Sequence, residues 1–324
     1  MTNHGQSMGG HFAIASLELH PGVYQGALLE CGVIDGVGIT DLYLAYKAGA
    51  EYFAGVLLLD AMDRPELPAR ISALWLPALG EPGSYTARGR RFDGVVKHLF
   101  GGDLPLRLQG LRLRYVPNML VPMPLTGPLG RAGSTLHVRY RIDPGLGVDE
   151  DELNRKIRRF APAAGARPRE SDPVFAELTG RITVPVLAIH ETGDARVPFS
   201  LQQAYRRRTL AARTSNLLVQ RAVRWGGHCA FDGEAREQAF DDLVAWIERG
   251  VKPEGDDVLA ADVSKLGLRW TSISIPTIRC AGGEAKQFVP NLRQTLILPG
   301  CGHWTQQERP AEVNAAVLEF LRAL

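Results

Sequence analysis

The sequence predicts an α/β fold built on a parallel sheet, chiefly because strands and helices alternate in its second half. Residues 184–190 and 216–225 have the apolar character of buried strands. Each is followed by a helical segment, at residues 200–212, with Ser200 as the expected cap, and at residues 234–249. This β-α-β-α order is typical of a parallel sheet that is covered by helices.

The N-terminal region contributes a second observation of the same kind. Residues 10–19 have helical character and end at Pro21 and Gly22. Residues 23–33 then form an apolar run bounded by glycine, which is the pattern of another buried strand. We therefore expect the core of the sheet in residues 1–34 and 181–252.

A long insertion separates these two parts of the core. Residues 35–180 are rich in proline, glycine and arginine, with short helical stretches at 40–54 and 148–160. The proline-rich residues 116–130 predict an irregular loop. Insertions of this length usually have a role of their own, so we expect a large, mostly helical cap or lid.

Composition excludes several classes of function. The chain has 324 residues and a net charge of +2, which gives no general attraction to nucleic acid or to anionic membranes. No apolar run approaches the roughly 18 residues that span a bilayer. The first ten residues lack the charged and apolar regions of a signal peptide, so we predict a cytoplasmic protein, with export of a longer parent left open. The four cysteines, Cys31, Cys229, Cys280 and Cys301, are too few and too scattered to predict a disulfide framework or a metal site.

A candidate nucleophile lies close to the N-terminus. Residues 5–9 read Gly-Gln-Ser-Met-Gly, which matches the pattern G-x-S-x-G. A serine on a sharp turn between a strand and a helix needs small neighbours, because the chain folds tightly against itself there. The backbone amide after such a serine helps to bind an oxyanion. The pattern therefore predicts Ser7 as the nucleophile and the Met8 amide as an oxyanion-hole donor.

The candidate acid follows the strand at 184–190. Asp194 lies on a loop at the carboxyl end of that strand, where parallel sheets form their ligand-binding crevice. A carboxylate there can accept a hydrogen bond from a histidine ring and stabilise the imidazolium. Asp35, after the earlier strand, is an alternative acid. Strand alternation directs Glu191 away from the site.

The candidate base is His228, which follows two glycines on a loop between a strand and a helix. These glycines let the backbone and the ring approach a neighbouring loop closely. An imidazole in this place can take the serine proton and return it to a leaving group. His190 ends a strand and is interpreted as a core residue or one that supports the site from behind.

These three motifs resemble those of α/β-hydrolase esterases. The segments that carry the resemblance read GQSMGGHFA, VPVLAIHETGDARVPFS and WGGHCAFDGEAREQAFDDLVAWI, and they occur in the order nucleophile, acid, histidine. The resemblance spans about residues 4–250. It implies an α/β-hydrolase fold and a Ser-His-Asp triad of Ser7, His228 and Asp194. In this family most of the sheet, about a hundred residues by ordinary element lengths, precedes the elbow. Here six residues do, so we expect a core that lacks its N-terminal strands and one oxyanion donor.

The C-terminal residues 253–324 carry a different resemblance. The sequence LPGCGHWTQQERPAEVNAAVLEFL is similar to the histidine loop and last helix of epoxide-hydrolase-type α/β-hydrolases. Those relatives use an aspartate nucleophile, and no such motif occurs in this chain. Strands are expected at 273–280 and 295–298 and a helix at 310–324, with His303 as an alternative base. We interpret residues 253–324 as an appended segment, the product of truncation or gene fusion.

The resulting prediction is a carboxylic-ester hydrolase that acts through an acyl-serine intermediate, with no metal or organic cofactor. Its partners would be a small-molecule ester and water, with no nucleic acid. Two alternatives stay open: an epoxide hydrolase, and an inactive hydrolase fragment that serves as a binding or assembly module. Because an exposed sheet edge invites pairing with another chain, we also expect that the protein can form a homo-oligomer.

Overall fold

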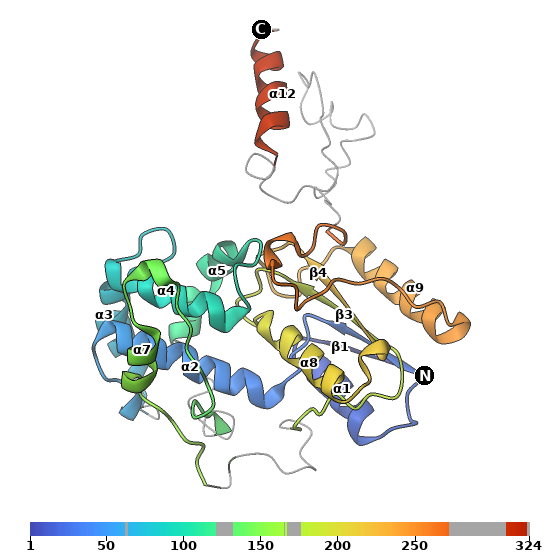
Figure 1. The fold of residues 1–324 in the computed structure, drawn as a ribbon, viewed down its shortest axis with the longest axis horizontal. Helices are drawn as coiled ribbons and strands as arrows, with labels where there is room; N and C mark the ends of the chain where they lie inside the picture. Colours follow the sequence, from blue (N-terminus) through green and yellow to red (C-terminus); the bar gives the residue numbers. More distant parts are fainter. Residues whose placement is uncertain (62–63, 121–131, 165, 167–175, 272–308, 323–324) are drawn as a thin grey trace.

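The structure is a computed structural model that describes residues 1–61, 64–120, 132–164, 166, 176–271 and 309–322. Within these residues the chain forms an α/β fold around one four-stranded parallel sheet (Figure 1). The α/β class and the parallel sheet predicted from the sequence are therefore confirmed. Among the described helices, none is long and apolar enough to cross a membrane.

The sheet contains β1 (Thr2–Gln6), β2 (Gly26–Glu30), β3 (Val186–Glu191) and β4 (Leu218–Val223), paired in that order. The register places Gln6 opposite Glu30, Glu30 opposite Ile189, and Ile189 opposite Arg221. The carboxyl ends of the strands thus lie along one edge of the sheet. Loops that follow different strands meet at that edge, even when they are far apart in sequence.

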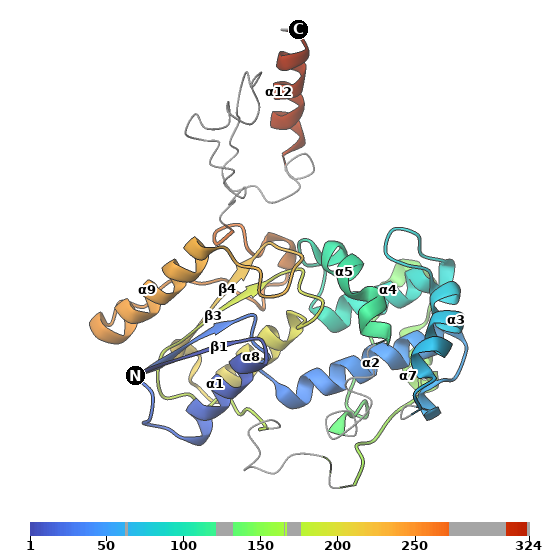
Figure 2. The same ribbon diagram turned by 180° about the vertical axis from the view of Figure 1, so that it is seen from behind.

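Helices cover both faces of the sheet (Figures 1 and 2). On one face lie α1 (Met8–Leu19) and α8 (Ser200–Ala211), which are joined where the Tyr205 hydroxyl donates to Glu18 at 2.8 Å. On the other face lies α9 (Gly233–Arg249).

Strand alternation separates two cores. Ala27, Leu29 and Ala188 belong to the core beneath α1 and α8. Their neighbours along the strands belong to the core beneath α9, which contains Leu28, Leu187, Ile189, Val219, Ala239, Leu243 and Trp246. Strands buried on both faces read as continuous apolar runs, which is why the sequence identified them.

Residues 35–180 supply a group of helices beside the sheet. They are α2 (Gly36–Ala54), α3 (Leu67–Leu79), α4 (Ala87–Phe100), α5 (Arg107–Leu120) and α7 (Glu150–Lys156). Their largest buried side chains, Tyr46, Trp75, Phe92 and Tyr115, join the core beneath α1. The helical character of this region agrees with the prediction, whereas its role as a cap remains a prediction.

The strand predicted at 23–33 and the helix predicted at 148–160 are shorter in the structure, as β2 and α7, and three further local predictions also differ. Ser200 is the first residue of α8 rather than its cap, and the flanking Phe199 makes no side-chain capping bond. Helix α2 begins at Gly36, earlier than predicted, because the Asp35 carboxylate accepts from the Gly38 amide and caps it. Helix α5 continues to Leu120, within the predicted loop, although Pro117 lies inside it and cannot donate to the carbonyl four residues earlier.

The segment after α9 runs along β4. The Asp256 amide donates to the Gln220 carbonyl at 2.7 Å, and the Ala222 amide donates to the Asp256 carboxylate at 2.7 Å. The predicted strands at 273–280 and 295–298 and the alternative base His303 lie outside the described residues. The predicted C-terminal helix is present as α12 (Pro310–Arg322).

Candidate active site

Ser7 lies on the turn between β1 and α1, at the carboxyl edge of the sheet. Its φ of 55° is in the left-handed region, which costs a non-glycine residue about 1–3 kcal/mol. Backbone hydrogen bonds hold the turn in place. The Ser7 amide donates to the Glu30 carbonyl at 3.0 Å, and the Val33 amide donates to the Ser7 carbonyl at 2.9 Å. The strained serine is therefore fixed by β2 and by the chain that follows it.

Two glycines of the motif are required by close backbone approaches. A Cβ atom on Gly5 would lie 2.1 Å from the Gly9 carbonyl oxygen, and one on Gly10 would lie 2.6 Å from the Gly32 Cα. No side chain fits at either position. Met8 is the first residue of α1, so its amide is among those that have no partner within the helix. A helix N-terminus at this place favours negative charge.

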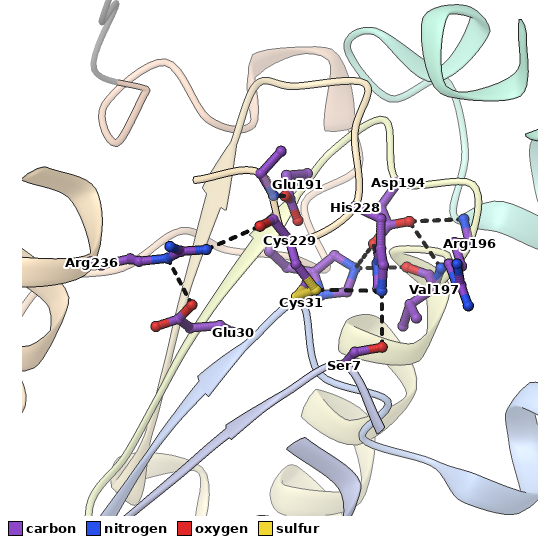
Figure 3. Close-up of a disulfide and its surroundings, with 12 residues drawn as sticks. Ser7, Glu30, Cys31, Glu191, Asp194, Arg196, Val197, His228, Cys229 and Arg236 are labelled. Carbon is purple, nitrogen blue, oxygen red and sulfur yellow. Dashed lines mark hydrogen bonds and ion pairs between the residues drawn. A yellow bond between two sulfur atoms is a disulfide. The ribbon is translucent and has the colours of Figure 1, made fainter. Parts of the chain in front are cut away.

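Asp194 lies on the loop after β3 and is buried. Its Oδ1 accepts from the Arg196 and Val197 amides at 2.8 and 2.9 Å, which fixes the carboxylate. Its other oxygen accepts from His228 Nδ1 at 2.7 Å (Figure 3). The loop also stays in register with the next strand, because the Gly193 amide donates to the Trp225 carbonyl at 2.9 Å.

His228 connects the acid to the serine. With Nδ1 protonated and donating to Asp194, the Nε2 atom is left as an acceptor. It lies 2.9 Å from Ser7 Oγ, so the hydroxyl can donate to it (Figure 3). The His228 side chain is 12% exposed, so most of the ring is buried. The three residues that the sequence singled out thus lie in one hydrogen-bonded chain.

Two further titratable residues, His190 and Glu191, lie close to these three hydrogen-bonded side chains. Burial lowers the pKa of His190, which keeps the ring neutral. His190 Nε2 donates to the Val197 carbonyl at 2.7 Å, and Nδ1 accepts from Gln202 at 3.0 Å. Burial, with the charge of Asp194, raises the pKa of Glu191 to about 8. The Glu191 carboxyl accepts from the Ala230 amide at 2.6 Å and so supports the histidine loop.

The helical region packs directly against the acid loop. A Cβ atom on Gly110 of α5 would lie 1.6 Å from the Gly193 carbonyl oxygen. The Asn118 side chain donates to the Ala195 carbonyl at 2.8 Å, and the Thr192 hydroxyl donates to the Pro105 carbonyl at 2.7 Å. Helix α5 therefore packs against the loop that carries Asp194.

A disulfide between Cys31 and Cys229 lies against His228 (Figure 3). This bond was not predicted from the sequence, since the two cysteines are 198 residues apart. A signal was present: one cysteine follows the strand beside the elbow, and the other is adjacent to His228. The triad prediction itself brings those two positions together.

The alternative candidates occupy other places. Asp35 caps α2, and its second oxygen pairs with Arg208 at 2.6 Å. The carboxylate that accepts from His228 is that of Asp194.

Within the described residues, the Cys31, His228 and Cys229 ligand atoms lie within 4.8 Å of one another. Both sulfurs are bonded to each other, so we assign no metal to this group.

Comparisons with known proteins give one partial match. Epoxide hydrolase A of Mycobacterium tuberculosis (strain ATCC 25618 / H37Rv) is 38% identical over 68 residues, which cover 18% of this chain and 21% of that enzyme. The chain thus matches about a fifth of that relative's length. No protein-family model matches, and no solved structure gives a significant match. The partial match, together with the parallel sheet, supports a relationship to the α/β-hydrolases and a hydrolase-type function.

Proposed function

We propose that the protein is a carboxylic-ester hydrolase that acts through an acyl-serine intermediate. The observation that carries the proposal is the chain of hydrogen bonds from Ser7 Oγ through His228 to Asp194, at 2.9 and 2.7 Å. A nucleophile within reach of a base, which is itself oriented by a third group, is the arrangement that activates a serine.

In the first step, Ser7 Oγ attacks the ester carbonyl carbon while His228 Nε2 takes the hydroxyl proton. The carbonyl oxygen becomes an oxyanion, which the Met8 amide is placed to stabilise at the start of α1. The imidazolium then gives its proton to the departing alcohol as the ester bond breaks. An acyl group remains on Ser7.

In the second step, water replaces the alcohol. His228 takes a proton from water as it attacks the acyl carbon, and returns the proton to Ser7 Oγ as the acid leaves. Asp194 stabilises the imidazolium in both steps. It can do so because two backbone amides fix its other oxygen, so the carboxylate does not need to reorganise.

Epoxide hydrolysis is a second candidate, favoured by the partial match to an epoxide hydrolase. The relatives that the C-terminal segment resembles use an aspartate nucleophile. In this chain the residue at the elbow is Ser7, whose hydroxyl needs a base to become nucleophilic. The site therefore favours the ester over the epoxide as substrate.

Labelling with a fluorophosphonate tests the nucleophile. Attack by Ser7 Oγ would form an O–P bond and release fluoride, and peptide mapping should place the adduct on Ser7. Ser7→Ala should abolish labelling and lower ester hydrolysis by about 10⁵- to 10⁶-fold, since triad members act as a unit. Ser16→Ala is the matched control, because that hydroxyl lies on α1 and donates to the Phe12 carbonyl.

The outcomes separate the candidates. Labelling of Ser7 with loss of ester turnover in Ser7→Ala supports the proposal. Unchanged hydrolysis in Ser7→Ala would remove Ser7 from the mechanism. A folded wild-type protein that is neither labelled nor active on esters, but opens epoxides, would favour the second candidate. Absence of all three activities would indicate a module without catalysis.

A further inference from the structure

The position of the Cys31–Cys229 disulfide suggests a role in the reaction as well as in stability. Cys229 is adjacent to His228 in the chain, and its Sγ lies 3.4 Å from His228 Nε2. The Cα atoms of the two cysteines are 5.2 Å apart. The bond thus ends beside the nitrogen that must receive the serine proton (Figure 3).

At its other end the disulfide is attached to Cys31, next to the strand whose backbone bonds Ser7. Cys31 directly follows β2, is fully buried, and donates its amide to the Ile189 carbonyl at 2.8 Å. The preceding residue, Glu30, accepts the Ser7 amide through its carbonyl. One covalent bond therefore links the backbone that holds the serine to the loop that holds the base.

The histidine loop needs such a restraint. Gly226 and Gly227 precede His228 and give the loop conformational freedom. Cys229 has a φ of 56° and Cys31 a φ of 44°, conformations that persist only when the surroundings impose them. Apart from the disulfide, the loop is held by hydrogen bonds: the Cys229 carbonyl accepts from Arg236, and the Ala230 amide donates to Glu191.

We propose that Cys31 and Cys229 are positioning residues for the reaction, and that their disulfide keeps His228 Nε2 within reach of Ser7 Oγ. This inference rests on the proposed function. A dithiol reductant would break the S–S bond, delivering two electrons and two protons to the sulfurs, and would itself become a disulfide. Cys229 is half-buried and Cys31 fully buried, so attack begins at the Cys229 sulfur.

The consequence is a loss of rate rather than of fold. A displacement of about 1 Å in a catalytic group can cost about a hundredfold in rate. We expect reduction to lower both kcat and the rate of fluorophosphonate labelling by about 10- to 100-fold, at a temperature where both forms are folded. KM should change little, because neither cysteine is assigned a contact with substrate. Reoxidation should restore the rate.

The test uses the full chain with Cys280→Ser and Cys301→Ser, so that no other thiol can exchange. That background alone is the control and should match the wild type. Cys31→Ser, Cys229→Ser and the double variant should each show the same loss, since the disulfide acts as a unit, and none should respond to the reductant. Mass spectrometry of the oxidised protein should recover the linked Cys31 and Cys229 peptides.

A second readout does not depend on activity. Hydrogen exchange of the Ala230 amide should become faster on reduction, while that of the Ser7 amide should not. Equal labelling rates and equal Ala230 exchange in the two redox states would overturn the proposal. Faster Ala230 exchange in a protein that never labels Ser7 would keep the positioning role of the disulfide and reject the proposed function. A lower melting temperature with unchanged kcat would show that the disulfide has a structural role only, and would overturn the proposal.

Discussion

The two halves of the candidate site are held in different ways. The serine turn is fixed locally: its shape depends on Gly5 and Gly10, which lie within three residues of Ser7, and on backbone bonds to the neighbouring strand. The histidine loop is fixed from a distance. Its restraints come from Cys31, Glu191 and Arg236, which belong to β2, β3 and α9 or lie next to them.

This difference sets what each half can tolerate. The elbow is held by close backbone contacts and backbone hydrogen bonds, which involve no titratable or redox-active side chain. The histidine loop depends on an oxidised disulfide and on a carboxyl whose pKa is raised to about 8. We therefore expect the position of the histidine loop to depend on redox state and pH, and that of the elbow not to.

The largest expected effect comes from removing the base. His228→Ala should lower ester hydrolysis by about 10⁵- to 10⁶-fold, because Ser7 then has no group to accept its proton. His303→Ala is the comparison, since the sequence also offered that histidine as a base. It should leave kcat within a fewfold of the wild type. The reverse pattern in a steady-state ester assay would assign the active site to residues 253–324.

The strands and the turn at Ser7 could be predicted from the sequence because their determinants are local. Six consecutive residues, 5–10, determine the elbow, and buried parallel strands can be recognised as apolar runs. Prediction from the sequence was less successful where a side chain meets a distant partner. The pairing of Cys31 with Cys229 and the bond from Ala230 to Glu191 depend on the order of strands in the sheet. Spacing alone does not reveal that order.

Asp35 illustrates the same limit. Both it and Asp194 follow a predicted strand, so position along the chain did not separate them. The structure shows different partners for the two carboxylates. Asp35 bonds the first turn of the helix that follows it, as a capping residue does. Asp194 bonds the amides of its own loop with one oxygen and presents the other to His228.

The next effect in size distinguishes these two acids. In Asp194→Asn, the amide oxygen can still accept from Arg196 and Val197, which turns the NH₂ group toward His228. The ring would then carry its proton on Nε2 and could not accept from Ser7, so we expect a loss of about 10⁴-fold in kcat. Asp35→Asn should keep the helix cap and most of the activity. Similar losses in both variants, with unchanged circular dichroism, would contradict this assignment.

The smallest effect concerns the support of the histidine loop and appears in stability. Glu191 has a pKa of about 8 in the folded chain, raised by burial and by Asp194, against an ordinary value of 4.5. Between these two values the folded chain holds a proton that the unfolded chain has released. The contribution of Glu191 to the free energy of unfolding should therefore be largest below pH 4.5. As pH rises from 4.5 to about 8, this contribution should fall by up to about 1.4 kcal/mol per pH unit.

Glu191→Gln isolates this contribution. The glutamine oxygen can accept from the Ala230 amide as the glutamate does, but the side chain stays neutral at every pH. Denaturant titrations of both proteins at pH 5, 6, 7 and 8 should show that the variant gains stability relative to the wild type as pH rises. Every other titrating group is shared, so the difference between the two curves belongs to Glu191. Parallel curves, or a relative loss for the variant with rising pH, would mean that Glu191 is ionised beneath the loop. In that case the carboxylate would accept the Ala230 amide as a charged group, and high pH would not weaken the support of His228.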